Sequence, residues 1–442
     1  MNTLVQKCIR GGTAVKIAES IEAAVRDGKM RAGERLPTIR DLSGQLGVSP
    51  ATVAAGYQAL QARGVVQAQG RRGTRISHRP VHPLCRRAVV PAGTRNLADG
   101  NPDPALLPPI DRILARIDSR PRLYGEAQQD AGLVALAARD LARCGVAAGG
   151  ICVVNGAMDG IERILTEHLR CGDRVAVEDP GFGNMFDLVI SRGLALLPVP
   201  VDEEGLLPEG LGRAVAEGAK AVIVTPRAHN PTGAVLSQER AKELRRVLRK
   251  APDVLIIEDD HAGLITDAPL HCLHDARRPR WAHVRSFSKS LNPDLRLAVL
   301  TGDNTTMTRV QDRLLVGERW VSHLLQRIGY GLLADAAVRS HLNNVARIYG
   351  ERRGALVGAL KRAGLPAAGR SGYNVWVPVL EETTTVQTLA AVGWAVAAGE
   401  RFRLNAPPAI RITAATLLPE EADRLAGDVA SILARPGVSV TV

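Results

Sequence analysis

Near the start of the chain, apolar residues recur at intervals of three to four positions, the spacing of a helix with one buried face. This pattern covers residues 13–27 and ends at Gly28. A second, shorter helix is predicted to begin at Pro37 and Thr38 and to end at Gly47. Its inward-facing residues are predicted to be Ile39, Leu42 and Leu46.

A third helix is predicted to follow directly. Ser49 is a good N-cap residue, Pro50 suits the first helical position, and the apolar spacing continues to about Arg63. Two helices joined by a glycine-containing turn are typical of the helix-turn-helix motif. In that motif the N-terminal end of the second helix reaches base edges and phosphates. In this chain that helix is the third one predicted, and Ser49 and Thr52 lie at its N-terminal end.

Two short β-prone runs follow, on either side of a turn formed by Gly70, Arg71, Arg72 and Gly73. A hairpin placed after a helix-turn-helix is a wing. Its arginines Arg71, Arg72 and Arg75 are expected to lie along a phosphate backbone or to enter a minor groove.

The charge of the chain is concentrated in the same region. Residues 1–95 hold 16 Lys and Arg against 5 Asp and Glu, whereas the remaining residues hold 41 against 40. A small basic module on a neutral body indicates a polyanionic partner, most often nucleic acid. A solvated basic face is the alternative. Residues 79–95 contain prolines and show no periodicity, which is typical of a linker.

From about residue 96 short apolar runs alternate with helical stretches, which predicts an α/β domain around a largely parallel sheet. In such sheets ligands bind beyond the strand ends. The expected buried strands are residues 175–179, 194–199, 221–226, 254–260, 283–288 and 297–302.

Several polar groups fall at those strand ends. Lys289 is flanked by Ser286 and Ser288, and Arg296 follows seven residues later. This arrangement suits a lysine that attacks an aldehyde beside a bound phosphate, which hydroxyls and a guanidinium would hold. Taken alone, the motif is a weak indication, because a surface lysine is its usual interpretation.

Asp259 lies at the end of another apolar run, where a carboxylate is costly unless it meets a cation. A protonated pyridine nitrogen is such a partner. A metal site or a helix cap would be the alternatives, but no further ligands make a metal convincing. The six scattered cysteines are interpreted as reduced, mostly buried thiols of a cytoplasmic protein.

Three further elements complete the pattern. Asn230 begins a rigid Asn-Pro-Thr-Gly turn, from which its amide could donate to a cofactor oxygen. Gly156 and Ala157 precede a helix whose free N–H groups could bind a phosphate. Phe182 follows a strand and could stack on a flat ring.

Residues 13–77, and the stretch GERLPTIRDLSGQLGVSPATVAAGYQALQARGVV in particular, resemble the DNA-binding domain of the GntR family of bacterial regulators. The resemblance implies contacts with double-stranded DNA. The residues it implicates are Arg40, Ser49, Thr52 and the wing arginines Arg71, Arg72 and Arg75. A surface or capping role is the alternative for each of them.

Residues 96–434 resemble fold-type-I aminotransferases, which bind pyridoxal 5′-phosphate. The resemblance implies that Lys289 is the Schiff-base lysine, Asp259 the partner of the pyridine nitrogen, and Asn230 a neighbour of the 3′ oxygen. Phe182 would cover the ring, and Arg411 would bind a substrate carboxylate. The phosphate would be held by Gly156, Ala157, Ser286, Ser288, Arg296 and, from the other subunit of a dimer, Tyr124.

This chain departs from the family pattern at His261, where the enzymes have a tyrosine that bonds the 3′ oxygen. Histidine can still donate there, but its pKa is far below that of a phenol. Phe182 also stands where tyrosine is common. Efficient transamination is therefore in doubt, and the chain is not expected to act mainly as an enzyme.

A GntR-type module at residues 1–78, a linker at 79–95 and an aminotransferase-like domain at 96–442 match the MocR subfamily of GntR regulators. The stretches TPRAHNPTG, EDDHAG and SGYNVWVPV resemble the PtsJ/PdxR-like regulators of vitamin B6 metabolism. The chain is therefore expected to be a dimeric, cytoplasmic regulator that senses this vitamin. The alternatives are a regulator that senses another amine or amino acid through pyridoxal phosphate, and a working aminotransferase.

Overall fold

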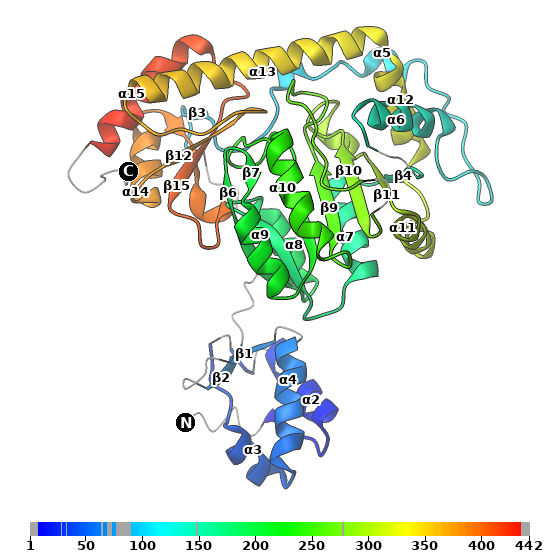
Figure 1. Ribbon diagram of the computed structural model, residues 1–442, viewed down its shortest axis with the longest axis vertical. Coiled ribbons are helices and arrows are strands. Elements are labelled where there is room, and N and C mark those ends of the chain that lie inside the picture. Colours follow the sequence, from blue (N-terminus) through cyan, green and yellow to red (C-terminus); the bar gives the residue numbers. More distant parts are fainter. Residues whose placement is uncertain are drawn as a thin grey trace. The chain divides into compact units, whose positions relative to one another are not determined.

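A computed structural model describes residues 8–27, 29–31, 33–62, 65–68, 73–76, 90–146, 149–275 and 278–434. The chain divides into two compact units, the first made chiefly of residues 1–86 and the second of most of the rest (Figure 1). Each unit has an apolar core of its own, so each is treated separately below.

The small unit contains the three predicted helices and the hairpin. Thr38 and Gly47 cap the second helix, as predicted, because the Thr38 hydroxyl accepts the Asp41 N–H and Gly47 takes a left-handed conformation. The elements are α2 (Ala14–Arg26), α3 (Ile39–Leu46), α4 (Pro50–Ala62), β1 (Val66–Ala68) and β2 (Thr74–Ile76).

The core of the small unit lies between α2 and α4. Ile17, Val53 and Leu60 are fully buried in it, and the hydroxyl of Tyr57 donates to the carbonyl oxygen of Pro37 at 2.9 Å. The prediction that Ile39 faces inward is wrong. Its side chain is exposed at the first position of α3, whereas Leu42 is buried and Leu46, partly buried, packs against the core as predicted.

An eight-stranded sheet forms the centre of the large unit, in the order β4-β11-β10-β9-β8-β5-β6-β7. The inner strands β5, β8, β9 and β10 run parallel to one another, whereas β11 runs antiparallel to both β10 and β4. The predicted, largely parallel sheet is therefore confirmed. Its strands are β4 (Cys152–Val154), β5 (Arg174–Asp179), β6 (Ala195–Asp202), β7 (Gly205–Leu206), β8 (Ala219–Val224), β9 (Leu255–Asp260), β10 (Trp281–Ser286) and β11 (Ala298–Gly302).

Helices between the strands cover this sheet, and α9 and α10 pack on one another at its surface (Figure 1). These helices are α5 (Asp111–Leu114), α6 (Ala131–Arg143), α7 (Ala157–His168), α8 (Gly183–Ser191), α9 (Pro208–Ala216), α10 (Gln238–Arg249), α11 (Asn304–Val316) and α12 (His323–Ala334). No helix among the described residues is both long enough and apolar enough to cross a membrane.

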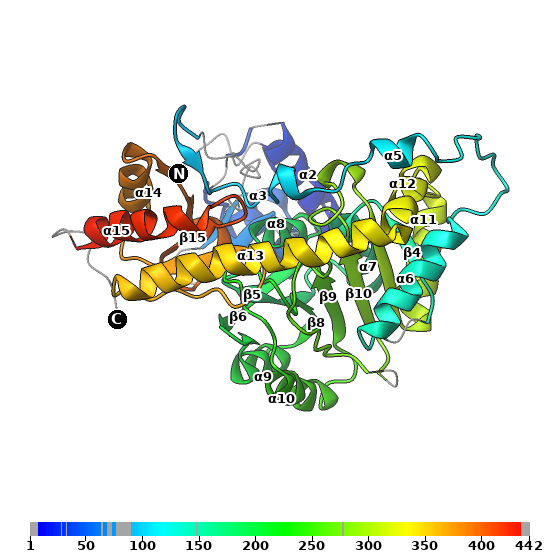
Figure 2. The same ribbon diagram turned by 90° about the horizontal axis from the view of Figure 1, so that it is seen from above.

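A second, smaller sheet joins β12 (Asn374–Pro378), β15 (Ala409–Thr413) and β14 (Ala397–Ala398). The 27-residue helix α13 (Ala336–Arg362) packs on α12 near one end and on α15 (Ala422–Leu433) near the other, so it links both sheets (Figure 2). Beside it, β3 (Arg95–Asn96) pairs with β13 (Trp394–Ala395), and α14 (Glu382–Ala391) contacts β13. Single-turn helices span Pro104–Leu106, Pro293–Leu295, Gly399–Phe402 and Pro419–Glu421.

Candidate functional site

The parallel strands bring the predicted site residues to one edge of the large sheet. Asp259 is the fifth residue of β9 and lies beside Val284 of β10. Lys289 lies in the turn that follows β10. Asn230 lies in the segment after β8, and Phe182 in the segment after β5. Since parallel strands all end at the same edge, four distant parts of the sequence meet there.

Lys289 is half-buried at this edge. Its ε-amine donates a hydrogen bond to the carbonyl oxygen of Gly100 at 2.8 Å. Burial, together with the nearby guanidinium groups of Arg411 and Arg296, lowers the pKa of Lys289 to about 8. An amine with a lowered pKa is partly neutral near pH 7 and can attack a carbonyl carbon.

Asp259 is buried, with 6% of its surface exposed, and its Oδ1 atom has no hydrogen-bond partner among the described residues. Burial, with the neighbouring carboxylates of Asp260 and Glu178, raises the pKa of Asp259 to about 7. A buried carboxylate oxygen without a donor is costly, so this atom suits a cationic or N–H donor supplied by a ligand.

The adjacent residue Asp260 is satisfied internally. Its carboxylate pairs with Arg227 at 2.9 Å and with Arg285 at 2.5 Å. Burial alone would raise the pKa of Asp260, but these two guanidinium groups hold it well below its usual value. Of the two neighbouring aspartates, only Asp259 therefore remains open to a ligand.

A third buried carboxylate of β9, that of Glu258, directly precedes Asp259. Glu258 accepts hydrogen bonds from His274 at 2.8 Å and from His283 at 3.0 Å. Donor atoms of Glu258, Cys272 and His283 lie within 4.8 Å of one another, a grouping that the sequence analysis did not anticipate. Because the carboxylate also accepts the Leu273 N–H, we interpret the cluster as an internal hydrogen-bond network.

Gly156 and Arg296 form an anion cradle beside Lys289. Gly156 precedes the first residue of α7, Ala157, and has φ +92°. A Cβ atom on Gly156 would lie 2.9 Å from a guanidinium nitrogen of Arg296, so only glycine lets this arginine approach the helix start. Nearby, the Oγ of Ser286 accepts the N–H of Ser288 at 3.2 Å. A helix N-terminus facing a guanidinium suits a phosphate.

Arg411 closes another side of the site. It is buried on β15, donates to the side-chain oxygen of Asn230 at 3.0 Å, and also donates to the carbonyl oxygen of Ala98. Its guanidinium lies 4.5 Å from the ring centre of Phe402. The predicted carboxylate-binding arginine and the predicted cofactor-binding asparagine are thus in direct contact.

Two participants escaped the sequence analysis. The carbonyl oxygen of Gly100 accepts from Lys289 and, at 3.3 Å, from the hydroxyl of Tyr373. Burial raises the pKa of Tyr373 above its usual range. The stretch Asp99–Asp103 has turn composition, but no local pattern connects it to residues nearly two hundred positions away.

The remaining predicted cofactor-binding residues are His261, Phe182 and Tyr124. His261 is half-buried, and burial together with the charge of Lys289 lowers its pKa to about 4, so its ring is neutral at pH 7. Phe182 is half-buried where α8 begins. Tyr124 is 80% exposed and packs edge-on against Trp320, on the loop that extends from the large unit (Figure 2). Its predicted role requires a second subunit.

The small unit presents some of the predicted DNA-contacting residues on its surface. Arg40 and Ser49 are exposed, and the Ser49 hydroxyl caps α4 by accepting the Thr52 N–H at 3.1 Å. Arg75 donates to the carbonyl oxygen of Gly33 at 2.8 Å, so part of its hydrogen-bonding capacity serves the module itself. Arg71 and Arg72 lie outside the described residues.

The cysteines agree with expectation in part. Among the described ones, Cys152 is buried, while Cys8, Cys144 and Cys272 are partly buried and pack against the apolar cores. Cys171 is the exception: it is exposed, because it lies in the turn before β5 rather than within a packed element.

Comparison with known proteins agrees with this division into units. Residues 13–76 match the family of bacterial regulatory proteins called gntR, and residues 129–429 match aminotransferase class I and II. Among solved structures, the kynurenine aminotransferase of Pyrococcus horikoshii, in complex with PMP, superposes with a TM-score of 0.71 at 21% identity. That similarity covers 77% of this chain and 91% of the enzyme.

Full-length relatives are regulators. The vitamin B6 salvage pathway transcriptional repressor PtsJ of Salmonella typhimurium is 41% identical over 97% of this chain and 100% of its own length. The regulator TauR of Rhodobacter capsulatus is 29% identical over 83% of each chain. The pyridoxine biosynthesis regulator PdxR of Corynebacterium glutamicum is 28% identical over 76% of each. The chain therefore belongs to the aminotransferase class I and II family and, because a gntR-type module precedes that unit, to the MocR subfamily of GntR transcription regulators.

Proposed function

We propose that this regulator binds pyridoxal phosphate at the Lys289 site and changes its affinity for DNA in response. The observation that carries the proposal is the pairing of a reactive amine with an unsatisfied carboxylate. Lys289 has a lowered pKa, and the buried Oδ1 of Asp259 lacks a donor at the same sheet edge. A pyridine ring that bears an aldehyde and a protonated nitrogen satisfies both groups.

The residues present fit this cofactor. Lys289 would bind its aldehyde carbon, Asp259 its ring nitrogen, and Arg296 with the N–H groups after Gly156 its phosphate. Asn230 would face the 3′ oxygen, with His261 nearby as a neutral donor. When bound, pyridoxal phosphate supplies an electron-withdrawing ring and a reactive carbonyl. Ser286 and Ser288 would complete the phosphate site, and Phe182 would cover the ring.

The site also offers a way to respond. The carbonyl oxygens of Gly100 and Ala98 accept hydrogen bonds from Lys289 and Arg411. A ligand that engages the amine or the guanidinium removes these donors from residues 98–100. This segment follows β3, the first described strand after the predicted linker. Ligand binding would thus alter the packing of the chain where it leaves the linker. The ligand must favour one arrangement over the other for DNA affinity to change.

We further propose that the large unit forms a homodimer. Large apolar side chains are exposed on α5, α11 and α12 and in the segment between α5 and α6. The three helices lie at one end of the large unit (Figure 2). Val316 and Tyr124 are each 80% exposed. The set comprises Leu114, Leu123, Tyr124, Leu315, Val316, Leu324 and Tyr330. A patch of this kind indicates a protein interface, and a dimer would present two gntR-type modules to paired DNA half-sites.

The ligand class follows from the relatives. PtsJ is described as a repressor of vitamin B6 salvage, and it aligns with nearly the whole chain. We therefore propose that genes of B6 metabolism are controlled by this protein, acting on DNA in the cytoplasm through Arg40, Ser49, Thr52 and the wing arginines. The proposed organisation is a DNA-binding domain at residues 1–78, a linker at 79–95 and a ligand-binding domain at 96–442.

The test is DNA binding with and without the vitamer. Fluorescence anisotropy of a duplex from upstream of the gene should give a dissociation constant that changes at least several-fold when pyridoxal phosphate is added. Pyridoxine 5′-phosphate, which keeps the phosphate but lacks the aldehyde, is the matched control and should have little effect. Equal affinity with and without pyridoxal phosphate would overturn the proposal, and failure to bind any upstream DNA would favour a working aminotransferase.

A second function is favoured by Arg411. This buried guanidinium lies near enough to Lys289 to lower its pKa, which is the arrangement needed to hold the carboxylate of an amino acid while its amine reacts. A regulator that senses an amino acid through the bound cofactor would use both groups. Titrating amino acids and amines into the loaded protein, while following its visible spectrum and DNA affinity, separates this function from direct B6 sensing.

A further inference from the structure

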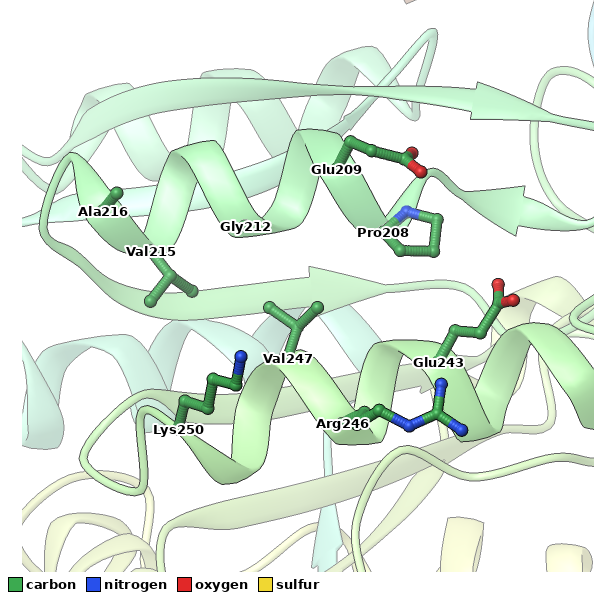
Figure 3. Close-up of a pocket in the computed structure, with 9 residues that line it drawn as sticks. All are labelled: Pro208, Glu209, Gly212, Val215, Ala216, Glu243, Arg246, Val247 and Lys250. Carbon is green, nitrogen blue, oxygen red and sulfur yellow. The ribbon is translucent and has the colours of Figure 1, made fainter.

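A groove of about 510 Å³ separates helices α9 and α10 on the surface of the large unit. Figure 3 shows its apolar floor, where Val215 of α9 approaches Val247 of α10, and its charged rim on α10. A second hollow, of about 340 Å³, lies along the same helix and is lined by Lys242, Arg245, Arg246, Arg249 and Asp275. Both hollows share Arg246, so they form one continuous surface, called here the α10 surface.

The cations of the α10 surface are largely uncommitted. Arg246, Arg249 and Lys250 are exposed, and the described residues provide no side-chain hydrogen bond or ion pair to any of them. Arg240 on the same helix differs sharply, because its guanidinium pairs with Asp202 at 2.7 Å and is mostly buried. Lys242 and Arg245 are engaged as well, with the carboxylate of Glu239 at 3.6 Å and the carbonyl oxygen of Cys272 at 3.3 Å. The uncommitted cations of this surface are therefore Arg246, Arg249 and Lys250, which have no evident structural purpose.

The row is also unusual within its unit. Residues 96–442 carry almost no net charge, with 41 basic and 40 acidic side chains. Residues 238–250 alone hold six Lys and Arg against two Glu. From Arg246 to Lys250 the uncommitted cations extend over about 6 Å of helix. One DNA strand carries a phosphate for about every 3.4 Å of its axis, so these cations match two or three successive phosphates rather than one isolated anion.

We propose that the α10 surface contacts the phosphate backbone of DNA outside the sequence read by the small unit. The inference rests on the proposed DNA-binding function and extends it, since it assigns part of the binding energy to the aminotransferase-like unit. Arg246, Arg249 and Lys250 each neutralise a phosphate. Contacts to phosphates carry no sequence information, so this surface increases affinity for long DNA of any sequence.

The proposal is tested with the variant R246Q/R249Q/K250Q of the full chain. Its matched control is R139Q/R143Q/K361Q, which removes the same charge from exposed sites on α6 and α13. Affinity is measured by anisotropy from 0.05 to 0.5 M salt, with three duplexes: the operator alone, the operator with long flanks, and a long duplex of unrelated sequence. Each lost phosphate contact should reduce the slope of log K against log salt by about 0.9.

The α10 variant should lose a slope of about 2 to 3 on both long duplexes and little on the operator alone, whereas the control variant should match the wild type. Near 0.1 M salt this corresponds to an affinity loss on the order of 10²-fold that vanishes toward 1 M. An unchanged slope on the long duplexes overturns the inference. Because the unrelated duplex needs no operator, failure of specific operator binding would instead count against the proposed function.

Discussion

The ε-amine of Lys289 donates a hydrogen bond to the carbonyl oxygen of Gly100, which lies 189 positions away in the sequence. The amine is therefore held in place before any ligand arrives, in surroundings that keep its pKa near 8. Preorganisation of this kind suits a nucleophile, because the group need not be ordered at the moment of reaction.

Replacing Lys289 by alanine should abolish the visible absorbance that develops when pyridoxal phosphate binds a lysine covalently. The cofactor would retain only its noncovalent contacts to Asp259 and Arg296, so its affinity should fall at least tenfold. Titration followed by absorbance and by equilibrium dialysis measures both effects. The exposed Lys250 changed to alanine is the control, and an unaltered band in K289A would refute the assignment.

In the protein without cofactor, the ionisation of Asp259 should make the free energy of unfolding depend on pH. The folded-state pKa is raised from 3.8 to about 7, so the folded chain binds a proton that the unfolded chain has already released in this range. Stability linked to that proton is present below about pH 4 and is lost as pH rises through 7. At about 1.4 kcal/mol per pKa unit, the full loss is about 4 kcal/mol.

Asp259→Asn should remove this dependence. Urea unfolding at pH 5 and pH 8 would show the wild type losing more stability than the variant over that interval, with the difference reduced when pyridoxal phosphate is bound. The comparison between the two proteins, which differ only at residue 259, isolates the contribution of this carboxyl group and its couplings. If both proteins lost stability equally, Asp259 would not carry the raised pKa.

The position of Asp259 near the end of a strand could be predicted because it follows a run of consecutive apolar residues, 254–257, the strongest local signal in the sequence. Lys289 was recognised instead from its hydroxyl neighbours Ser286 and Ser288, because the strand before it also carries His283 and Arg285. Several strands of two or three residues in the large unit could not be predicted. Cys152–Val154, Trp394–Ala395 and Ala397–Ala398 are too short to show a period, and only their neighbours in the fold define them. Gly100 was missed for the same reason, since its role depends on a contact far away in sequence.

Ile39 shows how a local pattern can mislead. It has the spacing of a buried residue relative to Leu42 and Leu46, but it is the first residue of α3, where the helix has not yet met its neighbours. The buried position that precedes the helix is taken by Leu36 instead. Periodicity predicts which face is apolar, whereas the helix end decides how much of that face is covered.

Gly156→Ala should weaken the binding of phosphate-bearing vitamers selectively. The new Cβ would lie 2.9 Å from a guanidinium nitrogen of Arg296 and would force it away from the helix start. The backbone, at φ +92° and ψ 167°, would in addition cost about 1–3 kcal/mol of stability. Isothermal titration with pyridoxal phosphate and with pyridoxal distinguishes loss of the phosphate contact from general damage.

Gly145→Ala provides the matched control for that variant. Gly145 also has positive φ, at +79°, but a Cβ there would meet nothing within 4 Å. It should lose stability without losing the preference for the phosphate. If both variants bound pyridoxal phosphate and pyridoxal with unchanged relative affinity, the cradle formed by Gly156 and Arg296 would not be the phosphate site.

Arg40 and Ser49 should separate DNA contact from folding in the small unit. Arg40→Ala removes an exposed side chain, so stability should stay within about 0.5 kcal/mol of the wild type, while the salt slope of operator binding falls by about 1. Ser49→Ala removes the cap that accepts the Thr52 N–H and should cost about 0.5–2 kcal/mol of stability. Thermal melts with parallel anisotropy titrations test both, and an R40A variant that bound DNA normally would contradict the prediction.

Val316→Asp should dissociate the proposed dimer. Val316 is 80% exposed at the end of α11, so a carboxylate there costs little in a single chain, whereas at an apolar interface it would be buried without a partner. Sedimentation equilibrium should give 47.1 kDa for the variant and twice that mass for the wild type. Val392→Asp is the control, because Val392 is also exposed but lies beside α14, on the part of the large unit that carries the small sheet.

The V316D variant should also bind a paired operator with the affinity expected for one half-site. A wild type that sediments as a single chain would refute the dimer and would leave Tyr124 without the partner subunit that its predicted role requires. A V316D protein that still sediments at twice the mass of one chain would place the interface elsewhere.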